Sequence, residues 1–255
     1  MTKIILSGAN GKMGRVIQNV VSLRDDCEIV AGVDLNTEST SFPVYTDINE
    51  ITEKADVIID FSNPVLLDSL LAYSKANKMP LVIATTGYDD NQKAQINDAS
   101  KECPIFFTYN MSMGINLLAN LAKKAVSVLG SDFDIEIIEK HHNQKVDAPS
   151  GTAIMLAEAI NEACDARYVY EYDRHSRRMK RPKHEIGIHS IRGGTIVGEH
   201  EVLFAGRDEQ LSLKHTITSK EVFAVGAVNA AAFLIGKPEG LYDMSDLLAE
   251  QQKGE

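Results

Sequence analysis

The sequence predicts an α/β protein with two parts: a parallel-sheet domain and a second α+β domain with a mixed or antiparallel sheet. In the first half, short apolar runs alternate with segments whose apolar residues recur at helical spacing, which is typical of a parallel sheet flanked by helices. In the second half, several strand-like runs follow one another without an intervening helix. A chain of 255 residues is long enough to bury two cores. The predicted parallel strands span residues 3–8, 28–34, 56–62, 81–87 and 104–110.

The pattern changes after a predicted helix at residues 114–130. The chain then continues as a strand toward residue 141, a helix from residue 151, and a succession of strands at 186–217 with turns at RGG and GRDE. Strands joined by such turns favour antiparallel or mixed pairing. The last predicted helix, at 220–236, is compatible both with capping the second domain and with returning to the first.

Composition favours a small-molecule function in the cytoplasm. Asp and Glu number 36 against 26 Lys and Arg, a net charge of −10, which argues against general attraction to nucleic acid or anionic membranes. No run approaches the roughly 18 apolar residues of a membrane span, and the N-terminus enters a strand without an apolar leader. Cys27, Cys103 and Cys164 form no CxxC pair, so we expect three buried thiols rather than disulfides or a metal site.

The segment GANGKMG, residues 8–14, places three glycines directly after the first predicted strand and at the start of the first helix. Glycine there lets the backbone approach a pyrophosphate, and the helix N-terminus offers unpaired N–H groups and a positive dipole end. Asp34 ends the second strand, twenty residues after Gly14, the distance expected for an acid that binds the ribose hydroxyls. We therefore expect a dinucleotide site in a Rossmann-like domain rather than a merely structural tight turn.

Neighbouring residues bear on the choice of nicotinamide. Leu35 follows the ribose-binding acid where an arginine would meet a 2′-phosphate, which favours NADH, whereas Lys12 and Arg15 leave NADPH open. Because ligands lie outside the carboxyl ends of parallel strands, the segments 84–87 and 108–112 should also border the cofactor. Ordinary turn chemistry would explain the same Thr, Gly and Asn residues.

The segment EIIEKHHNQKVDAPSGTA, residues 136–153, gathers unusual positive charge for an acidic protein. An alternating strand leads to His141 and His142, and Lys145 follows. A helix expected after Ser150 presents N–H groups to an anion. One loop thereby offers a general acid and ligands for two carboxylates of a small substrate. The alternative, with one histidine packed, the other solvated and Lys145 on the surface, stays open at this point.

Neither a metal site nor a nucleic-acid patch is expected. The seven histidines match none of the short spacings of metal-binding motifs. The run RHSRRMKRPKH, residues 174–184, carries six Lys or Arg residues but no interleaved aromatic residue. We interpret it as a solvated or substrate-steering loop.

These segments resemble the bacterial and plant 4-hydroxy-tetrahydrodipicolinate reductase family, also called dihydrodipicolinate reductase. The resemblance covers nearly the whole chain and is strongest in HHNQKVDAPSGTA, an element specific to this family. Further matching segments are GANGKMG, DFSNP (60–64), ATTG (84–87), YNMSMGIN (109–116), IRGGTIVGEHEVLFAG (191–206) and FAVGAVNAAAFLIGKPEGLYDMSDLL (223–248).

The resemblance implies a dinucleotide-binding domain at residues 1–112, rejoined by residues 222–255, and a substrate-binding and oligomerisation domain at 113–221. It implies that NADH or NADPH reduces the dicarboxylate 4-hydroxy-tetrahydrodipicolinate to tetrahydrodipicolinate with loss of water, in lysine and diaminopimelate biosynthesis. It also implies a cytoplasmic homotetramer.

Residue by residue, the resemblance implies that His141 is a proton donor or acceptor and that Lys145 is a proton donor. The positions matching substrate ligands are His142, Ser150, Gly151 and Thr152. The positions matching cofactor ligands are Gly8, Ala9, Asn10, Gly11, Lys12, Met13, Asp34, Ala84, Thr85, Thr86, Thr108, Tyr109, Asn110 and Met111.

Three positions depart from the family pattern. Leu35 stands where Arg is frequent, Ala84 replaces the first glycine of GTTG, and Met111 stands where Phe is frequent, which bears on NADPH preference and cofactor packing. Two other functions are compatible with the nucleotide turn: a related dehydrogenase of an aspartate-derived amino acid, and a non-catalytic nicotinamide sensor. A sensor would not need His141 together with Lys145, and such a dehydrogenase would not need a second carboxylate site.

Overall fold

The structure is a computed structural model that describes residues 1–38, 40–164 and 168–251. The chain divides into two compact units, Met1–Met113 with Glu221–Glu255, and Gly114–Lys220. Each boundary lies one residue from the expected one. The C-terminal segment belongs to the first unit, so the helix expected at 220–236 returns to the first domain instead of capping the second.

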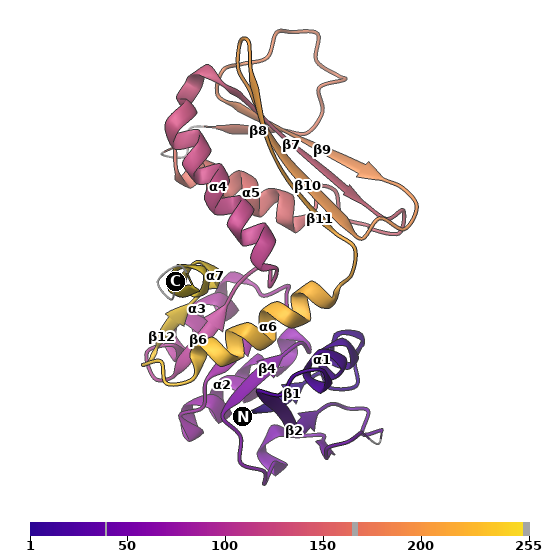
Figure 1. The fold of residues 1–255 in the computed structure, drawn as a ribbon, viewed down its shortest axis with the longest axis vertical. Coiled ribbons are helices and arrows are strands. Elements are labelled where there is room, and N and C mark those ends of the chain that lie inside the picture. Colours follow the sequence, from indigo (N-terminus) through magenta and orange to yellow (C-terminus); the bar gives the residue numbers. More distant parts are fainter. Residues whose placement is uncertain (39, 165–167, 252–255) are drawn as a thin grey trace. The chain divides into compact units, whose positions relative to one another are not determined.

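Seven parallel strands form the sheet of the first unit, in the order β12-β6-β5-β4-β1-β2-β3 (Figure 1). Ile4 and Ile5 of β1 and Ile58 and Ile59 of β4 are fully buried. Successive residues of these strands are buried because helices cover both faces of the sheet. The strands are β1 (Thr2–Ser7), β2 (Cys27–Val33), β3 (Val44–Tyr45), β4 (Val57–Asp60), β5 (Leu81–Ile83), β6 (Pro104–Phe107) and β12 (Gly240–Tyr242).

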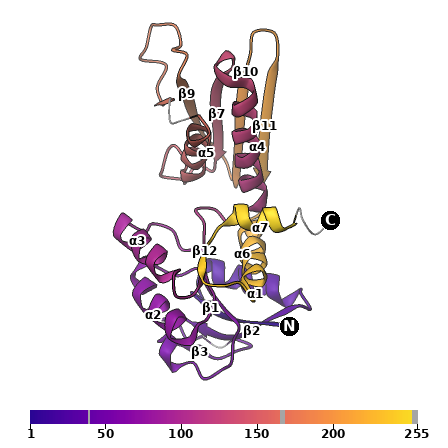
Figure 2. The ribbon, with the colours of Figure 1, turned by 90° about the vertical axis from the view of Figure 1, so that its left-hand side faces the viewer.

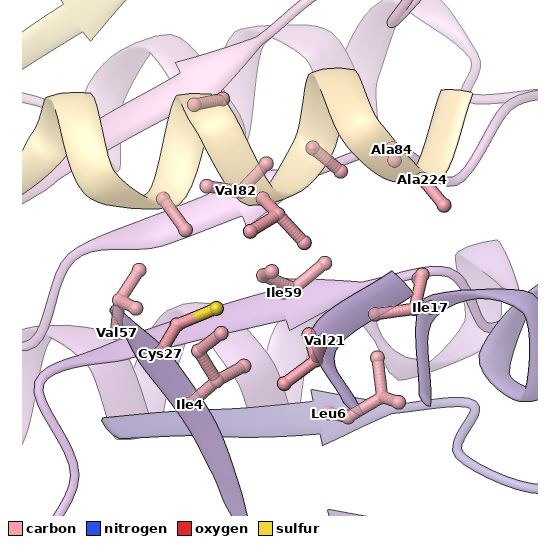
Figure 3. Packing of buried hydrophobic residues seen from close by; sticks show 14 of the residues in the cluster. Ile4, Leu6, Ile17, Val21, Cys27, Val57, Ile59, Val82, Ala84 and Ala224 are labelled. Carbon is pink, nitrogen blue, oxygen red and sulfur yellow. The ribbon is translucent and has the colours of Figure 1, made fainter. Parts of the chain in front are cut away.

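Two layers of helices cover this sheet. On one face, Ile17 and Val21 of α1 and Ala224 of α6 share a core with Ile4 and Ile59 (Figure 3). On the other face, helices α2 and α3 bury their apolar residues against the sheet. The helices are α1 (Lys12–Ser22), α6 (Glu221–Leu234) and α7 (Met244–Gln251) on the first face, and α2 (Leu67–Asn77) and α3 (Asp90–Ala99) on the second; two short 3₁₀ helices are η1 (Ile48–Glu50) and η2 (Pro64–Leu66).

A five-stranded sheet in the order β11-β10-β7-β9-β8 forms the second unit. β10 pairs antiparallel with β11 and β7, whereas β9 pairs parallel with β7 and β8. Helices α4 (Met113–Leu129) and α5 (Gly151–Glu162) pack on one face (Figures 1 and 2). The strands are β7 (Asp134–His141), β8 (Val169–Glu171), β9 (Glu185–Arg192), β10 (Gly198–Ala205) and β11 (Gln210–Ile217), and the 3₁₀ helix η3 (Gly130–Asp132) precedes β7.

This architecture confirms the predicted class, a helix-flanked parallel sheet followed by a mixed sheet. All three cysteines are buried, as expected. In the described parts of the chain, every helix is too short or too polar to cross a bilayer. Helices α3 and α7 and the short strands β3, β8 and β12 were not expected from the sequence pattern.

Candidate active site

Glycines shape the turn between β1 and α1. Gly8 has a φ of +79°, and a Cβ there would lie 2.5 Å from the carbonyl oxygen of Phe61, so the position requires glycine. A Cβ at Gly14 would lie 2.1 Å from the carbonyl oxygen of Gly8, because α1 starts directly against the turn. Gly11, the N-cap of α1, contributes no side-chain cap. The first turn of α1 can therefore receive an anion such as a pyrophosphate.

Asp34 ties this turn to the loop that follows β2. Its two carboxylate oxygens accept hydrogen bonds from the backbone N–H groups of Asn10 and Asn36, each at 2.9 Å. The side-chain amide of Asn10 donates to the carbonyl of Asn36 at 2.7 Å. Since a carboxylate oxygen accepts more than one hydrogen bond, Asp34 retains acceptor capacity for ribose hydroxyls while it fixes the turn.

An exposed ion pair lies beside this acid. The guanidinium of Arg15 donates to the carboxylate of Glu38 at 2.9 Å, and the two side chains are 61% and 63% exposed. Leu35 is 91% exposed, so its apolar side chain does not pack in the core. Any 2′-phosphate bound by Arg15 would compete with Glu38 for the guanidinium.

A buried acid connects the loops that follow β4 and β5. Asp60, the last residue of β4, is fully buried and accepts hydrogen bonds from the backbone N–H and the hydroxyl of Ser62. The same backbone N–H of Ser62 lies 2.8 Å from the hydroxyl oxygen of Thr85, and the Tyr88 hydroxyl is 3.4 Å from Asp60. Burial raises the pKa of Asp60, against the opposing hydrogen bonds. Of the segment 84–86, Thr86 is exposed, whereas Ala84 and Thr85 are buried.

The segment 108–111 is divided between surface and core. Tyr109 is 62% exposed, and the Thr108 hydroxyl makes local contacts with the backbone of Asn110. Met111 is only 3% exposed and belongs to the core cluster, and its carbonyl oxygen packs against Gly226 of α6. Any cofactor contact of Met111 would therefore involve its backbone, and its place in the cofactor set stays a prediction.

In the second unit, the helix-covered face of the sheet changes from apolar to polar along β7, between Ile137 and Glu139. Ile137 of β7 lies beside Ile188 and Val202 of its neighbours. Two residues further, Glu139 lies beside His200 of β10, and the next inward residue of β7 is His141, which pairs with Arg192 of β9. Ile137 and Glu139 are both fully buried, and His141 is 8% exposed. The strand thus carries Glu139 and His141 to one end of the covered face.

Glu139 is the centre of a hydrogen-bonded cluster. Arg192 donates to its two oxygens, each at 2.7 Å, and Nδ1 of His141 lies 2.7 Å from Oε2. The backbone N–H of Ser150 donates to Oε1 at 3.1 Å, and the Ser150 hydroxyl lies 2.9 Å from Nε2 of His200. One buried carboxylate thereby joins the end of β7 to β9 and to the start of α5.

Charges in this cluster follow from burial and hydrogen bonding. Burial opposes ionisation of Glu139, but the hydrogen bonds, led by those from Arg192, outweigh it and lower the pKa of Glu139 to about 2. Burial lowers the pKa of His141, which Glu139 opposes. Burial, reinforced by His141, lowers the pKa of His200 to about 4, so His200 is neutral at physiological pH.

The loop after β7 holds the remaining predicted residues. Lys145 Nζ pairs with Oδ1 of Asp147 at 2.9 Å, and its side chain is 22% exposed. The carbonyl of Asp147 accepts from Arg192, so the loop is attached to the Glu139 cluster. His142 is half-buried. His141 is thus packed, into a polar cluster, and the acid and carboxylate-binding roles expected of this loop stay predictions.

Helix α5 starts at this loop. Ser150 is its N-cap, with the hydroxyl accepting from the Ala153 N–H at 3.2 Å. Gly151 and Thr152 form the first turn, and a Cβ at Gly151 would meet no atom within 4 Å. The N-terminus of α5 thus combines the positive end of the helix dipole with open space beside Gly151.

The basic run at 174–184 is largely exposed, as a solvated loop would be, but three of its arginines are paired with acids of the sheet. Arg181 is 16% exposed and donates to Glu136 and Asp134, each at 2.8 Å. Arg174 and Arg177 pair with the buried acids at the ends of β9 and β8. These arginines attach the run to the sheet. No three His, Cys, Asp or Glu side chains of residues 1–38, 40–164 and 168–251 are grouped as metal ligands.

Glu139, Arg192 and His200 are members of the hydrogen-bonded cluster that were not expected from the sequence. The signal for Glu139 was present, because a period of two that places Ile135 and Ile137 inside also places Glu139 and His141 inside. Arg192 and His200 reach the cluster only through strand register, for which the sequence offers no local signal.

Comparison with known proteins gives the same family for both units. The N-terminal model of dihydrodipicolinate reductase matches residues 2–111, and the C-terminal model matches residues 114–248. The 4-hydroxy-tetrahydrodipicolinate reductase of Caldanaerobacter subterraneus subsp. tengcongensis is 50% identical over 248 residues, covering 97% of this chain and 98% of the relative. The enzyme of that name from Clostridium novyi is 51% identical over 249 residues, with coverages of 97% and 98%. The structure of dipicolinate-bound dihydrodipicolinate reductase from Paenisporosarcina sp. TG-14 superimposes with a TM-score of 0.79 at 26% identity, covering 95% of this chain and 97% of that one.

Proposed function

Because the chain belongs to the dihydrodipicolinate reductase family, we propose that it reduces 4-hydroxy-tetrahydrodipicolinate to tetrahydrodipicolinate with NADH or NADPH. The reaction takes up one hydride and one proton and releases one water. It therefore requires a nicotinamide site, ligands for two carboxylates and an acid. The observation that carries the proposal is the buried His141, held by Glu139 beside the N-terminus of α5.

The first unit supplies features that fit a nicotinamide dinucleotide, which when bound provides the hydride. The glycine-only positions Gly8 and Gly14 would let the backbone and the helix N-terminus approach a pyrophosphate, and Asp34, which accepts from the Asn10 N–H, would also accept from the ribose hydroxyls. Thr86 and Tyr109 are the exposed side chains of the two further segments assigned to the cofactor. Of the remaining members of the cofactor set, Lys12 has an exposed side chain, and the others would contribute backbone or part-buried contacts.

The second unit supplies features that fit a dicarboxylate. Lys145 and His142 offer cationic or hydrogen-bonding contacts, and Ser150, Gly151 and Thr152 place a helix N-terminus beside them. The structural relative from Paenisporosarcina carries dipicolinate, an aromatic dicarboxylate. We assign the two substrate carboxylates to these residues.

The proton comes from the same loop. Lys145 is a donor with three N–H bonds, and His141, whose pKa burial lowers, can both accept and donate a proton. We assign Lys145 as the proton donor, with His141 as donor or acceptor beside it. Preorganised cations also stabilise the negative charge that arrives with the hydride.

A coupled assay tests the function. Pyruvate and aspartate semialdehyde are condensed by the preceding enzyme of the pathway, and nicotinamide absorbance at 340 nm is followed after the chain is added. We expect oxidation of NADH, NADPH or both that depends on the condensed product. Absence of oxidation above background with both cofactors contradicts the proposal, and oxidation with aspartate-derived amino acids alone would favour a related dehydrogenase.

The choice of cofactor and the assembly are also proposed. NADH is favoured because Leu35 offers no charge to a 2′-phosphate and Arg15 is paired with Glu38. We also propose a cytoplasmic homotetramer, as the family resemblance implies. Among the described residues, helices α4 and α5 pack on one face of the second sheet, and we place a partner subunit on its other face. Ile191, on the other face, is 45% exposed. Light scattering after gel filtration measures the mass.

A further inference from the structure

Glu139 is a fully buried carboxylate that neither the cofactor nor the substrate requires directly. It stands on the inner face of β7, where the two preceding inward residues, Ile135 and Ile137, are core. A buried charge is costly unless it is paired and hydrogen-bonded. Here Arg192 donates to both oxygens, and His141 and the Ser150 backbone add one contact each.

These contacts determine which nitrogen of His141 exchanges a proton. An ionised carboxylate only accepts hydrogen bonds, so Nδ1 of His141 must carry hydrogen whether the ring is neutral or charged. The two-pronged contact with Arg192 keeps Glu139 ionised and fixed in place. The exchangeable proton of His141 is therefore on Nε2.

Room around Nε2 is provided by a glycine. A Cβ at Gly198 of β10 would lie 3.2 Å from Nε2 of His141, so any larger residue would cover or displace that nitrogen. Glu139 thus holds the ring at Nδ1, and Gly198 places no side chain beside Nε2.

We propose that Glu139 is a positioning residue that holds His141 as the Nδ1–H tautomer and directs Nε2 to proton exchange. The purpose of this arrangement rests on the proposed reductase function. As the donor, His141 breaks its Nε2–H bond while that proton bonds to the substrate, the neutral ring retains Nδ1–H, and solvent returns the proton in the next cycle. As the acceptor beside the donor Lys145, the neutral ring takes up a proton at Nε2 and later releases it to solvent.

The charges that face His141 set the expected pH dependence. The charged groups are Glu139 on the same strand, Arg192 from β9 and Lys145 from the loop, and the titratable but neutral group is His200 from β10. Glu139 is the negative member of this group, so the Glu139→Gln change lowers the pKa of His141. If protonated His141 is the reactive form, the alkaline limb of the kcat/KM profile moves to lower pH.

The experiment combines ¹⁵N NMR of histidine-labelled protein with kinetics. The His141 signals are assigned by their loss in His141→Asn, and the Nδ1 and Nε2 shifts report the tautomer in the absence of substrate and cofactor. We expect Nδ1–H in the wild type, a mixed or Nε2–H population in Glu139→Gln, and a roughly 10²-fold loss of kcat/KM with the displaced limb.

Glu136→Gln is the matched control. Glu136 lies on the same strand but on the opposite face, and it also binds an arginine and a histidine, Arg181 and His189. The control should keep the His141 tautomer and the pH profile. A wild-type spectrum with Nε2–H, or a Glu139→Gln variant with unchanged tautomer and limb, overturns the positioning role. An inactive wild type contradicts the reductase function instead, and the spectra still decide the role of Glu139.

Discussion

The ammonium of Lys145 lies 2.9 Å from Oδ1 of Asp147, and this hydrogen bond lowers the pKa of the Asp147 carboxyl. A substrate carboxylate that binds Lys145 has to compete with this internal acid. The Asp147 side chain is 57% exposed, so solvent weakens the competition. We therefore expect the pair to moderate the affinity for a dicarboxylate.

Replacing the internal acid should strengthen dicarboxylate binding. In Asp147→Asn the negative charge beside Lys145 is lost, and we expect the Kd for dipicolinate to fall by about threefold to tenfold at low salt, with the gain reduced at 0.5 M salt. Isothermal titration calorimetry measures both values. Asp208→Asn, at a 91% exposed acid in the β10–β11 turn, is the control for net charge. Unchanged or weaker binding in Asp147→Asn alone would show that Asp147 does not compete with the ligand.

Removing the ammonium should separate proton donation from binding. For Lys145→Ala we expect turnover to fall on the order of 10²- to 10⁴-fold, as is typical for loss of a general acid. Dipicolinate affinity should fall much less, because His142 and the start of α5 remain. Lys124→Ala, an exposed lysine on α4, is the control. Wild-type turnover in Lys145→Ala would exclude Lys145 as the proton donor.

The Arg15–Glu38 pair should influence the choice of nicotinamide. In Glu38→Gln the guanidinium loses its anionic partner and becomes available to a 2′-phosphate, so we expect kcat/KM for NADPH relative to NADH to rise by about threefold to tenfold. Initial rates with each cofactor measure the ratio. Glu50→Gln, another exposed glutamate of the same unit, should leave it unchanged.

A second substitution tests the same site from the other side. Leu35→Arg adds a cation directly after Asp34 and should also raise the NADPH to NADH ratio. If both variants keep the wild-type ratio of kcat/KM for NADPH to that for NADH, the 2′-phosphate of NADPH lies away from this loop. The preference inferred for NADH then loses its basis.

Local patterns were sufficient for much of the fold. The five central strands carry continuous apolar runs because both faces are buried, and the glycine turn has backbone requirements that only glycine meets at Gly8. Helix α3 was missed because its sequence, DNQKAQINDA, buries only Ile96 and Ala99. Its signal was the capping box between Asp89 and Gln92. Strand β12 has three residues and exists through pairing with β6, which no local pattern reports.

The candidate site divides in the same way. His141, His142 and Lys145 occur within five residues, so one motif was enough to find them. Arg192 and His200 lie on two other strands, and their approach to Glu139 depends on parallel pairing of β7 with β9 and antiparallel pairing with β10. Register is a property of the assembled sheet, because a shift of one residue would move these side chains to the opposite face.

The buried acid Asp60 should make the stability of the first unit depend on pH. Burial raises its pKa in the folded state, so its contribution to stability is full below the unfolded pKa of about 4 and is lost as pH rises through the higher folded value. Asp60→Asn resembles the protonated acid and cannot ionise. Relative to the wild type, we therefore expect this variant to gain stability as the pH rises from 5 to 8, by about 1.4 kcal/mol for each pH unit between pH 5 and the folded pKa of Asp60. Hydrogen-exchange protection of β1 and β4, compared between variant and wild type at each pH, measures the difference, with Asp25→Asn as an exposed control. If instead Asp60→Asn loses protection relative to the wild type as the pH rises from 5 to 8, the wild-type Asp60 is ionised and its charge holds the loops after β4 and β5 together.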